Sequence, residues 1–224
     1  MSTLAGLSVV LPCFNEEANV ERAVLSAADA AAGTSDDYEV IVVDDGSADA
    51  TLAIASELAR RDRRVRVLVH AGARGHGAAV RTGMDAARMP WVLLIDAGLP
   101  VDPHELEGCV PIAAHADLVV GWRVAGHDRL TRRIGATARN LVVRRVFGAP
   151  VHDVDCAFKL VRRDLVARLP LTAHGPMIGA QLVVRALAAG GRVREVEVDR
   201  QPRSARPPSH SLPRRPARRR LSAR

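Results

Sequence analysis

Polar and acidic residues follow four apolar runs of the sequence, and their types and spacing favour ligand-binding chemistry. The four segments are LPCFNEE at 11–17, VDDGSAD at 43–49, HAGARGHGAAVRTG at 70–83 and LLIDAGLPVDP at 93–103. In an open parallel sheet, ligands bind beyond the carboxyl ends of the strands. If each apolar run is a strand, carboxylates and glycines collect at one sheet edge. There they can hold a polar ligand that carries hydroxyl and phosphate groups.

Asp44 and Asp45 stand directly after an apolar run. Carboxylates at a strand end can accept hydrogen bonds from ribose hydroxyls or from the amino groups of a base. A simpler interpretation is a turn, because Asp-Gly-Ser favours turns and Ser47 or Asp49 can cap the next helix. The two interpretations are compatible with each other.

The residues Arg74-Gly75-His76-Gly77 open a predicted helix. Glycines there allow close backbone approach, and a helix N-terminus attracts phosphate. The segment is not a P-loop, because no Gly-Lys-Ser or Gly-Lys-Thr follows, and Val80 replaces the third glycine of a dinucleotide fingerprint. Taken alone it would indicate only a flexible loop.

Three further groups of residues are weaker candidates. His104, Glu105 and Glu107 match no strong metal spacing and favour a solvated helix start. Asp153 and Asp155 flank a valine in a predicted extended segment, which would place both on one face. Cys156 is interpreted as a small buried hydrophobe rather than a nucleophile.

Strand-like runs alternate with helical patterns over the first half of the chain. The expected strands are 7–11, 38–43, 65–69, 91–95 and 118–121, and the expected helices are 16–32, 50–61, 77–88 and 104–115. Unbroken Val, Ile and Leu runs indicate strands buried on both faces, and the alternation predicts an α/β fold with a doubly wound parallel sheet. Beyond it we expect a basic helix at 130–147, an extended segment at 151–161, a helix at 176–189 and a strand at 192–198.

The length of 224 residues suits one domain, which we place at 1–201, followed by a disordered Arg- and Pro-rich tail at 202–224. Eight arginines and no acids lie in that tail, which leaves 24 basic against 25 acidic residues elsewhere, so a nucleic-acid-binding body is not indicated. The tail is equally compatible with contact to an anionic membrane surface and with a solvated end that has no role.

The chain has three widely spaced cysteines, no signal-peptide pattern and no window of roughly 20 apolar residues. These features predict a protein of a reducing compartment without a disulfide framework or a spanning helix. We therefore expect it in the cytoplasm or peripheral on the cytoplasmic membrane face.

The segments LPCFNEEANV, VIVVDDGSADAT, RGHGAAVRTGMDAA, VVGWR, HDVDCAFKL and VREVEV together resemble family 2 glycosyltransferases of the GT-A fold. In order and spacing they most resemble the dolichol-phosphate mannose synthase branch, which transfers sugar to a polyprenyl phosphate. The resemblance covers about residues 7–203. It implies a Rossmann-like, mostly parallel sheet with helices on both faces. It also implies a hexosyltransferase that moves a sugar, with inversion, from a nucleoside-diphosphate sugar to a polyprenyl (dolichyl or undecaprenyl) phosphate in cell-envelope glycan synthesis.

The resemblance also implies roles for individual residues. Those matching the nucleotide contacts and the loop beside the nucleotide are Pro12, Asn15, Glu16, Asp44, Asp45, Arg74, Gly75 and Gly77. Asp96 matches the first acid of the DxD motif, which holds Mg²⁺ or Mn²⁺ on the diphosphate. Arg123, with Arg132 or Arg133 after it, matches the residues that receive the acceptor phosphate. Asp153, Asp155 and Lys159 fall in a motif near the acceptor side.

The chain departs from the family pattern in three respects. Gly98 replaces the second acid of DxD. The EVPV ending of the family is here Glu195-Val196-Glu197-Val198, with Glu197 in place of the proline. We also expect no counterpart of the C-terminal transmembrane helices that some relatives have. Gly98 leaves open a second interpretation, a degenerate protein that binds a nucleotide sugar without turnover. A third is a nucleotidyltransferase on a similar sheet, which would release pyrophosphate.

The acceptor decides which catalytic groups the reaction needs. A phosphate acceptor is already an anion and needs an arginine clamp, as Arg123 and Arg133 suggest, more than a general base. A hydroxyl acceptor would need a carboxylate base, for which Asp153 and Asp155 are the candidates.

Overall fold

A mixed sheet forms the centre of the molecule. The computed structural model describes residues 3–123, 145 and 151–199, and within them seven strands lie in the order β3-β2-β1-β4-β6-β5-β7. The strands are β1 (Leu7–Cys13), β2 (Tyr38–Asp44), β3 (Val65–Val69), β4 (Trp91–Leu94), β5 (Leu118–Arg123), β6 (Lys159–Arg162) and β7 (Val193–Val198). β1 to β4 are mutually parallel and β7 is parallel to β5, whereas β6 runs antiparallel to both β4 and β5. The sheet is therefore mostly parallel, as predicted.

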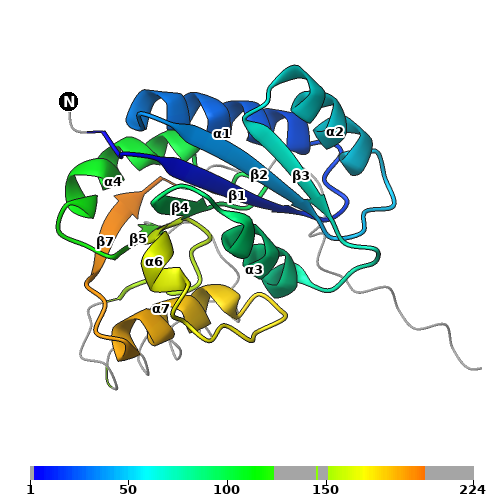
Figure 1. Ribbon diagram of the computed structural model, residues 1–224. Coiled ribbons are helices and arrows are strands. Elements are labelled where there is room, and N and C mark those ends of the chain that lie inside the picture. Colours follow the sequence, from blue (N-terminus) through cyan, green and yellow to red (C-terminus); the bar gives the residue numbers. More distant parts are fainter. Residues whose placement is uncertain (1–2, 124–144, 146–150, 200–224) are drawn as a thin grey trace, which may run out of the picture.

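Helices cover both faces of this sheet (Figure 1). They are α1 (Val20–Thr34), α2 (Thr51–Arg61), α3 (His76–Ala86), the 3₁₀ helix η1 (Pro103–Glu105), α4 (Leu106–Ala113), α6 (Arg163–Val166) and α7 (Ile178–Ala188). α1, α2 and α4 lie on one face, and α3, α6 and α7 lie on the other (Figure 1). This arrangement confirms the predicted doubly wound α/β architecture. Among the helices of the described residues, none is both long and apolar enough to cross a membrane.

The unbroken apolar strands follow from the two covered faces. Along β2, Val40 and Val42 belong to the core beneath α1 and α2, whereas Ile41 and Val43 belong to the core beneath α3. Successive side chains of a strand point to opposite faces, so a strand covered on both faces is apolar at every position. The β2 run is therefore fully buried from Val40 to Val43.

Two predicted elements differ from the structure. α1 begins at Val20 rather than at residue 16, because the backbone of the preceding segment is bonded to the 47–51 loop. The extended segment predicted at 151–161 is confirmed only in its last part: residues 151–158 contain a turn at 154–155 and no strand, and β6 starts at Lys159. The predicted helix at 130–147, apart from residue 145, and the tail at 202–224 lie outside the described residues.

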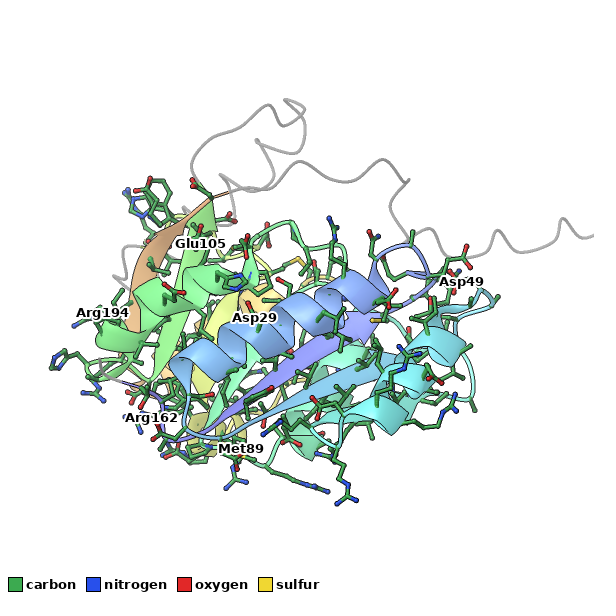
Figure 2. All side chains as sticks on the ribbon, turned by 90° about the horizontal axis from the view of Figure 1, so that it is seen from above. Asp29, Asp49, Met89, Glu105, Arg162 and Arg194 are labelled. Atoms are coloured by element: carbon green, nitrogen blue, oxygen red, sulfur yellow. The ribbon has the colours of Figure 1, made fainter. Side chains whose placement is uncertain are left out.

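A buried carboxylate joins the strands at the edge of the sheet where β1 and β2 begin. Glu39 Oε1 accepts hydrogen bonds from Ser8 Oγ (2.7 Å) and the Arg88 N–H (2.8 Å), and its Oε2 accepts one from Arg66 Nη1 (2.5 Å). Met89, next to Arg88, lies at this end of the sheet, while Asp49 lies at the far end (Figure 2). This network ties β1, β2 and β3 to the turn that precedes β4.

Acid stability should report on this network. Burial, the largest single influence, raises the pKa of Glu39, but the bonds from Arg66, Ser8 and the Arg88 N–H outweigh it and lower the pKa overall. Because the folded pKa is lower than the unfolded one, the stabilisation is present above the ordinary glutamate value, about 4.3, and is lost as the pH falls below it. Glu39→Gln should lower the free energy of unfolding by roughly 1–3 kcal/mol at pH 7 and flatten its decline below about pH 4.3.

Denaturant unfolding at pH 7 and at several lower pH values measures both effects. Glu57→Gln is the matched control, since Glu57 bonds Arg61 on an exposed helix surface and should change stability by less than about 0.5 kcal/mol. Parallel acid limbs for Glu39→Gln and the unsubstituted chain would contradict the assignment.

Candidate functional site at the carboxyl edge of the sheet

Acids from several segments converge where β1, β2 and β4 end. Cys13, the last residue of β1, lies among them and is buried. Burial raises the pKa of the Cys13 thiol, and the negative charges of Glu16, Asp44 and Asp96 raise it further. Acids that are far apart in the sequence thus act on one buried atom. The predicted gathering of carboxylates at this edge is confirmed for these residues.

Asp45 is buried and bonds the loop that follows β3. Its Oδ1 contacts His70 Nδ1 at 2.6 Å and accepts the Arg74 N–H at 2.9 Å, and its Oδ2 accepts the Gly75 N–H at 2.8 Å. The other ring nitrogen of His70 lies 2.9 Å from Thr82 Oγ1 on α3. A carboxylate offers about four acceptor positions, and three of them serve this loop. Asp45 therefore fixes the loop at 70–75, and the sequence did not identify His70 or Thr82 as its partners.

Asp44 differs from Asp45 in having a carboxylate oxygen without a partner. Only 1% of the residue is exposed. Its Oδ2 accepts the Ser47 N–H at 3.2 Å, while its buried Oδ1 has no hydrogen-bond partner among the described residues. An unmatched buried acceptor costs about 1–3 kcal/mol, and such a group calls for an explanation. A bound ligand that donates a hydrogen bond would supply the missing partner.

The segment after β1 is bonded to the loop after β2. The Asn15 N–H donates to Ser47 Oγ (2.9 Å), the Ala48 N–H donates to Asn15 Oδ1 (2.9 Å), and the Glu16 N–H donates to Thr51 Oγ1 (2.8 Å). Asn15 has a positive φ of 54°, a conformation that asparagine tolerates better than most residues. These bonds hold two loops of the edge together before any ligand arrives.

Pro12 lies within β1, opposite Val43 of β2, and is half-buried beside this pair of loops. The next residue, Cys13, is the one opposite Asp44.

Gly75 and Gly77 allow the chain near residue 174 to approach the start of α3. Gly75 has φ 96°, and a Cβ there would lie 2.6 Å from the His174 carbonyl oxygen. A Cβ at Gly77 would collide with the Ala173 carbonyl oxygen, and the Gly77 N–H donates to His174 O at 2.8 Å. The Gly77 amide is thus bonded within the protein. Close packing is therefore one reason for a glycine at both positions. The nucleotide contacts that the resemblance implies for these glycines and for the exposed Arg74 stay predictions.

Asp96 follows β4 in a tight turn. Ala97 and Leu99 are buried, Leu99 has φ 45°, and its N–H donates to the Asp96 carbonyl oxygen at 2.9 Å. The Asp96 side chain stays 38% exposed, and its Oδ1 lies 3.9 Å from Nε2 of His76. A Cβ at Gly98 would have no described atom within 4 Å, and Gly98 does not have a positive φ.

Within the described residues, no group of three or more His, Cys, Asp and Glu side chains could hold a metal ion. A cation at Asp96 would therefore take no more than two such ligands from the described residues and the remainder from a bound molecule or from water. The open space at Gly98 leaves room for such ligands.

The predicted acceptor side lies across β5 and β7. Arg123 is the last residue of β5, whereas Arg132 and Arg133 lie outside the described residues. Asp153 and Asp155 are both half-buried and do not lie in a strand, so strand alternation does not decide which face each one takes, and their placement on one face stays a prediction. Cys156 is completely buried, as predicted.

Glu195 of β7 holds this turn and was not identified from the sequence as doing so. Its Oε1 accepts the N–H groups of His152 (2.6 Å) and Asp153 (3.4 Å), and its Oε2 lies 2.7 Å from His152 Nδ1. The buried Lys159 supports the turn from below by donating to the Cys156 carbonyl oxygen. The turn that carries the two aspartates is therefore fixed on two sides.

His104 belongs to a helix start, as predicted. Its N–H and its Nδ1 lie 3.0 and 2.9 Å from Asp102 Oδ1, and its Nε2 lies 2.9 Å from Asp29 Oδ2 on α1. Hydrogen bonds from Asp102 and Asp29 raise the pKa of His104. These contacts tie the chain after Asp96 to α1.

Known proteins are similar to this chain in sequence and in architecture. The family described as Glycosyl transferase family 2 matches residues 8–169. The chain is 34% identical over 169 residues to dodecaprenyl-phosphate galacturonate synthase of Rhizobium johnstonii, an alignment that covers 74% of this chain and 50% of that protein. It is 32% identical over 162 residues to undecaprenyl-phosphate 4-deoxy-4-formamido-L-arabinose transferase of Pseudomonas aeruginosa, covering 71% and 48%. The chain thus spans about half the length of these two relatives.

An uncharacterised glycosyltransferase of Mycobacterium bovis is similar over more of its length: 36% identity over 202 residues, covering 88% of this chain and 86% of that protein. Among solved structures, glucosyl-3-phosphoglycerate synthase of Mycobacterium tuberculosis in complex with Mn²⁺, uridine diphosphate and phosphoglyceric acid superimposes with a TM-score of 0.70. The sequences are 25% identical, and the match covers 92% of this chain and 72% of that one. The chain therefore belongs to glycosyl transferase family 2 and has the GT-A fold that its sequence predicts.

Proposed function

We propose that this chain transfers a sugar from a nucleoside-diphosphate sugar to a polyprenyl phosphate, such as dolichyl or undecaprenyl phosphate. The carrying observation is the buried, unpartnered Oδ1 of Asp44 at the sheet edge where Asp96 also lies. Family membership supports a sugar donor, and two relatives are named for polyprenyl-phosphate acceptors.

On the donor side, Asp44 accepts a hydrogen bond from the base or the ribose of the nucleotide. Pro12, Asn15 and Glu16 form the wall beside it, and their loop is already bonded to residues 47–51. Asp45 acts as a positioning residue that holds the loop of Arg74 and Gly75 against the ligand. The exposed Arg74 side chain and the first turn of α3, which contains Gly77, then face the negative diphosphate.

The residues at Asp96 fit a divalent cation shared with the donor. Mg²⁺ commonly takes one or two protein carboxylates and completes its shell with substrate phosphates and waters. Asp96 supplies one half-exposed carboxylate, and Gly98 leaves the adjacent space open. When bound, Mg²⁺ or Mn²⁺ neutralises charge on the leaving diphosphate as a Lewis acid.

On the acceptor side, the phosphate is received by Arg123 and Arg133. A phosphate oxygen forms the bond to the anomeric carbon while the bond from that carbon to the diphosphate oxygen breaks on the opposite face, which inverts the configuration. The acceptor is already an anion, so no proton has to be removed before attack. Asp153 and Asp155, held by Glu195 and Lys159, orient the acceptor end of the site.

Because the proposed acceptor is a membrane lipid, we also propose that the reaction takes place at a membrane surface, on its cytoplasmic face. The eight arginines of residues 202–224 would attract anionic lipid, at about 1 kcal/mol for each one near the surface. This peripheral contact, with the 1–201 domain carrying the catalysis, remains a prediction.

Substitution of the two adjacent aspartates should affect ligand binding and stability differently. Asp44→Asn should weaken binding of the nucleoside diphosphate by roughly 1–3 kcal/mol while leaving the stability of the unliganded chain equal or higher, because a buried unpaired carboxylate is removed. Asp45→Asn should weaken binding and also lower unliganded stability by roughly 1–3 kcal/mol, because the bonds to the 70–75 loop are disturbed. Calorimetric titration and thermal unfolding measure the two properties. Equal stability losses for both variants would remove the distinction between ligand contact and positioning.

The acceptor assignment is tested at Arg123. Arg123→Ala should lower transfer to a polyprenyl phosphate by about 10²-fold or more while donor affinity stays nearly constant, because only the acceptor loses a charged partner. Steady-state kinetics with varied acceptor, together with donor titration, separate the two effects. Arg194→Ala, an exposed arginine on β7, is the matched control. Equal loss of donor affinity would instead place Arg123 at the diphosphate.

Gly98 favours a second candidate function, binding of a nucleotide sugar without turnover. Gly98→Asp tests it, because the backbone and the open space accept the larger side chain. If the natural chain is an enzyme, it should turn over, and Gly98→Asp should lower the Mn²⁺ concentration that it needs. Asp96→Ala should abolish metal-dependent donor binding in either case. A natural chain that is inactive at every Mn²⁺ concentration, beside an active Gly98→Asp variant, would establish the binding function instead.

A further inference from the structure

His76 faces Asp96 at the functional edge. Its Nε2 lies 3.9 Å from Asp96 Oδ1, and the two side chains are 17% and 38% exposed. His76 is the first residue of α3, whereas Asp96 follows β4, so only the fold brings them together. In this pair, the carboxylate of Asp96 lies beside a second side chain that can bind a metal ion.

The backbone on both sides of His76 is fixed. Before it, the Gly75 N–H is bonded to the buried Asp45 carboxylate. After it, the Gly77 N–H is bonded to the His174 carbonyl oxygen, and the absence of a Cβ at Gly77 lets that segment approach. The imidazole therefore stands on a rigid support, as a ligand that orients a cation requires.

We propose that His76 and Asp96 together hold the divalent cation that binds the donor diphosphate. The imidazole nitrogen supplies the second protein ligand in a chain that has Gly98 in place of an acid. This inference rests on the proposed function, because the diphosphate completes the coordination shell. Two ligands that each lie about 2.1 Å from one octahedral ion are about 3.0 Å apart when adjacent and about 4.2 Å apart when opposite. The observed 3.9 Å lies between these two values, so the side chains reach either arrangement by a shift of less than about 1 Å.

The ligand types predict which metal is preferred. Imidazole suits transition metals, whereas Mg²⁺ prefers oxygen ligands and keeps its waters. A site with one carboxylate and one imidazole should favour Mn²⁺ over Mg²⁺. The preference for Mn²⁺ over Mg²⁺ then comes from His76, because both ions can bind the carboxylate of Asp96.

Electron paramagnetic resonance of Mn²⁺ tests the coordination directly, without turnover. Mn²⁺ is titrated into the full chain with uridine diphosphate, and separately with guanosine diphosphate. Pulsed spectra should show coupling to an imidazole nitrogen, and His76→Ala should abolish it. The same variant should weaken Mn²⁺ binding by about tenfold or more and Mg²⁺ binding by less than about threefold.

Two further variants make the result specific. His104→Ala is the matched control, since His104 also contacts carboxylates, Asp102 and Asp29, but belongs to η1. It should leave both the coupling and the affinities unchanged. His76→Lys puts a positive charge at the position without a ring nitrogen and should not restore the nitrogen coupling or the Mn²⁺ preference. Unchanged thermal unfolding of the His76 variants confirms that they are folded.

Several results would overturn the inference. Absence of nitrogen coupling in the unsubstituted chain, or absence of Mn²⁺ binding with either nucleotide, would remove His76 from the metal. If His76→Ala weakens nucleotide binding equally with and without Mn²⁺, His76 contacts the nucleotide directly. Restored Mn²⁺ affinity in His76→Lys would point to charge rather than coordination.

The sugar-transfer proposal fails separately from this one. A chain that binds Mn²⁺ through His76 but never transfers sugar would contradict only the transfer, and sugar transfer without imidazole coupling would contradict only the metal assignment.

Discussion

The buried carboxylate of Asp45 fixes the geometry on which the functional edge depends. It lies directly after β2 and bonds the side chain of His70 and two backbone amides of the loop that leads to α3. A buried carboxylate is costly unless it is well hydrogen-bonded, so this loop is stable in one arrangement. The position of α3, and with it the position of His76 against Asp96, follows from that arrangement.

The rest of the edge is organised in the same way, by polar side chains that bond neighbouring loops. Asn15 joins the end of β1 to the loop after β2, and Glu195 bonds the turn before β6. At Gly77, the lack of a side chain lets the chain near residue 174 pack closely against α3. Loops that are ordered before binding lose less conformational entropy when the ligand arrives. Within this ordered frame, Oδ1 of Asp44 is the buried acceptor without a partner, and we propose that the ligand binds there.

Metal binding is the point at which this chain differs most from the pattern that its sequence resembles. Gly98 stands at the position of the second acid of the DxD motif. Among the described residues, no cluster of three or more possible metal ligands compensates for the missing carboxylate. A site with few protein ligands depends more on the diphosphate of the donor, which couples metal binding to donor binding. If Asp96 and His76 are the protein ligands, as we propose, their chemical types decide which metal is taken.

The sequence by itself determined the fold class, the position of most strands and the family. It could do so because unbroken apolar runs such as 40–43 report burial on both faces, and because motifs such as VDDGSADAT are local in the chain. It also located the edge, since strand ends are defined by the same runs. Residues 151–158, which contain a turn and no strand, were predicted as extended because their valines resemble a strand. The hydrogen bond that Glu195, about forty residues later, accepts from this segment cannot be read from the local sequence. Only the tertiary structure distinguished Asp44, with a free oxygen, from Asp45, whose oxygens are bonded to the 70–75 loop, and only it placed His76 beside Asp96. Those relations join residues that are far apart in the chain, and hydrogen-bond partners at such separations are set by packing rather than by local pattern.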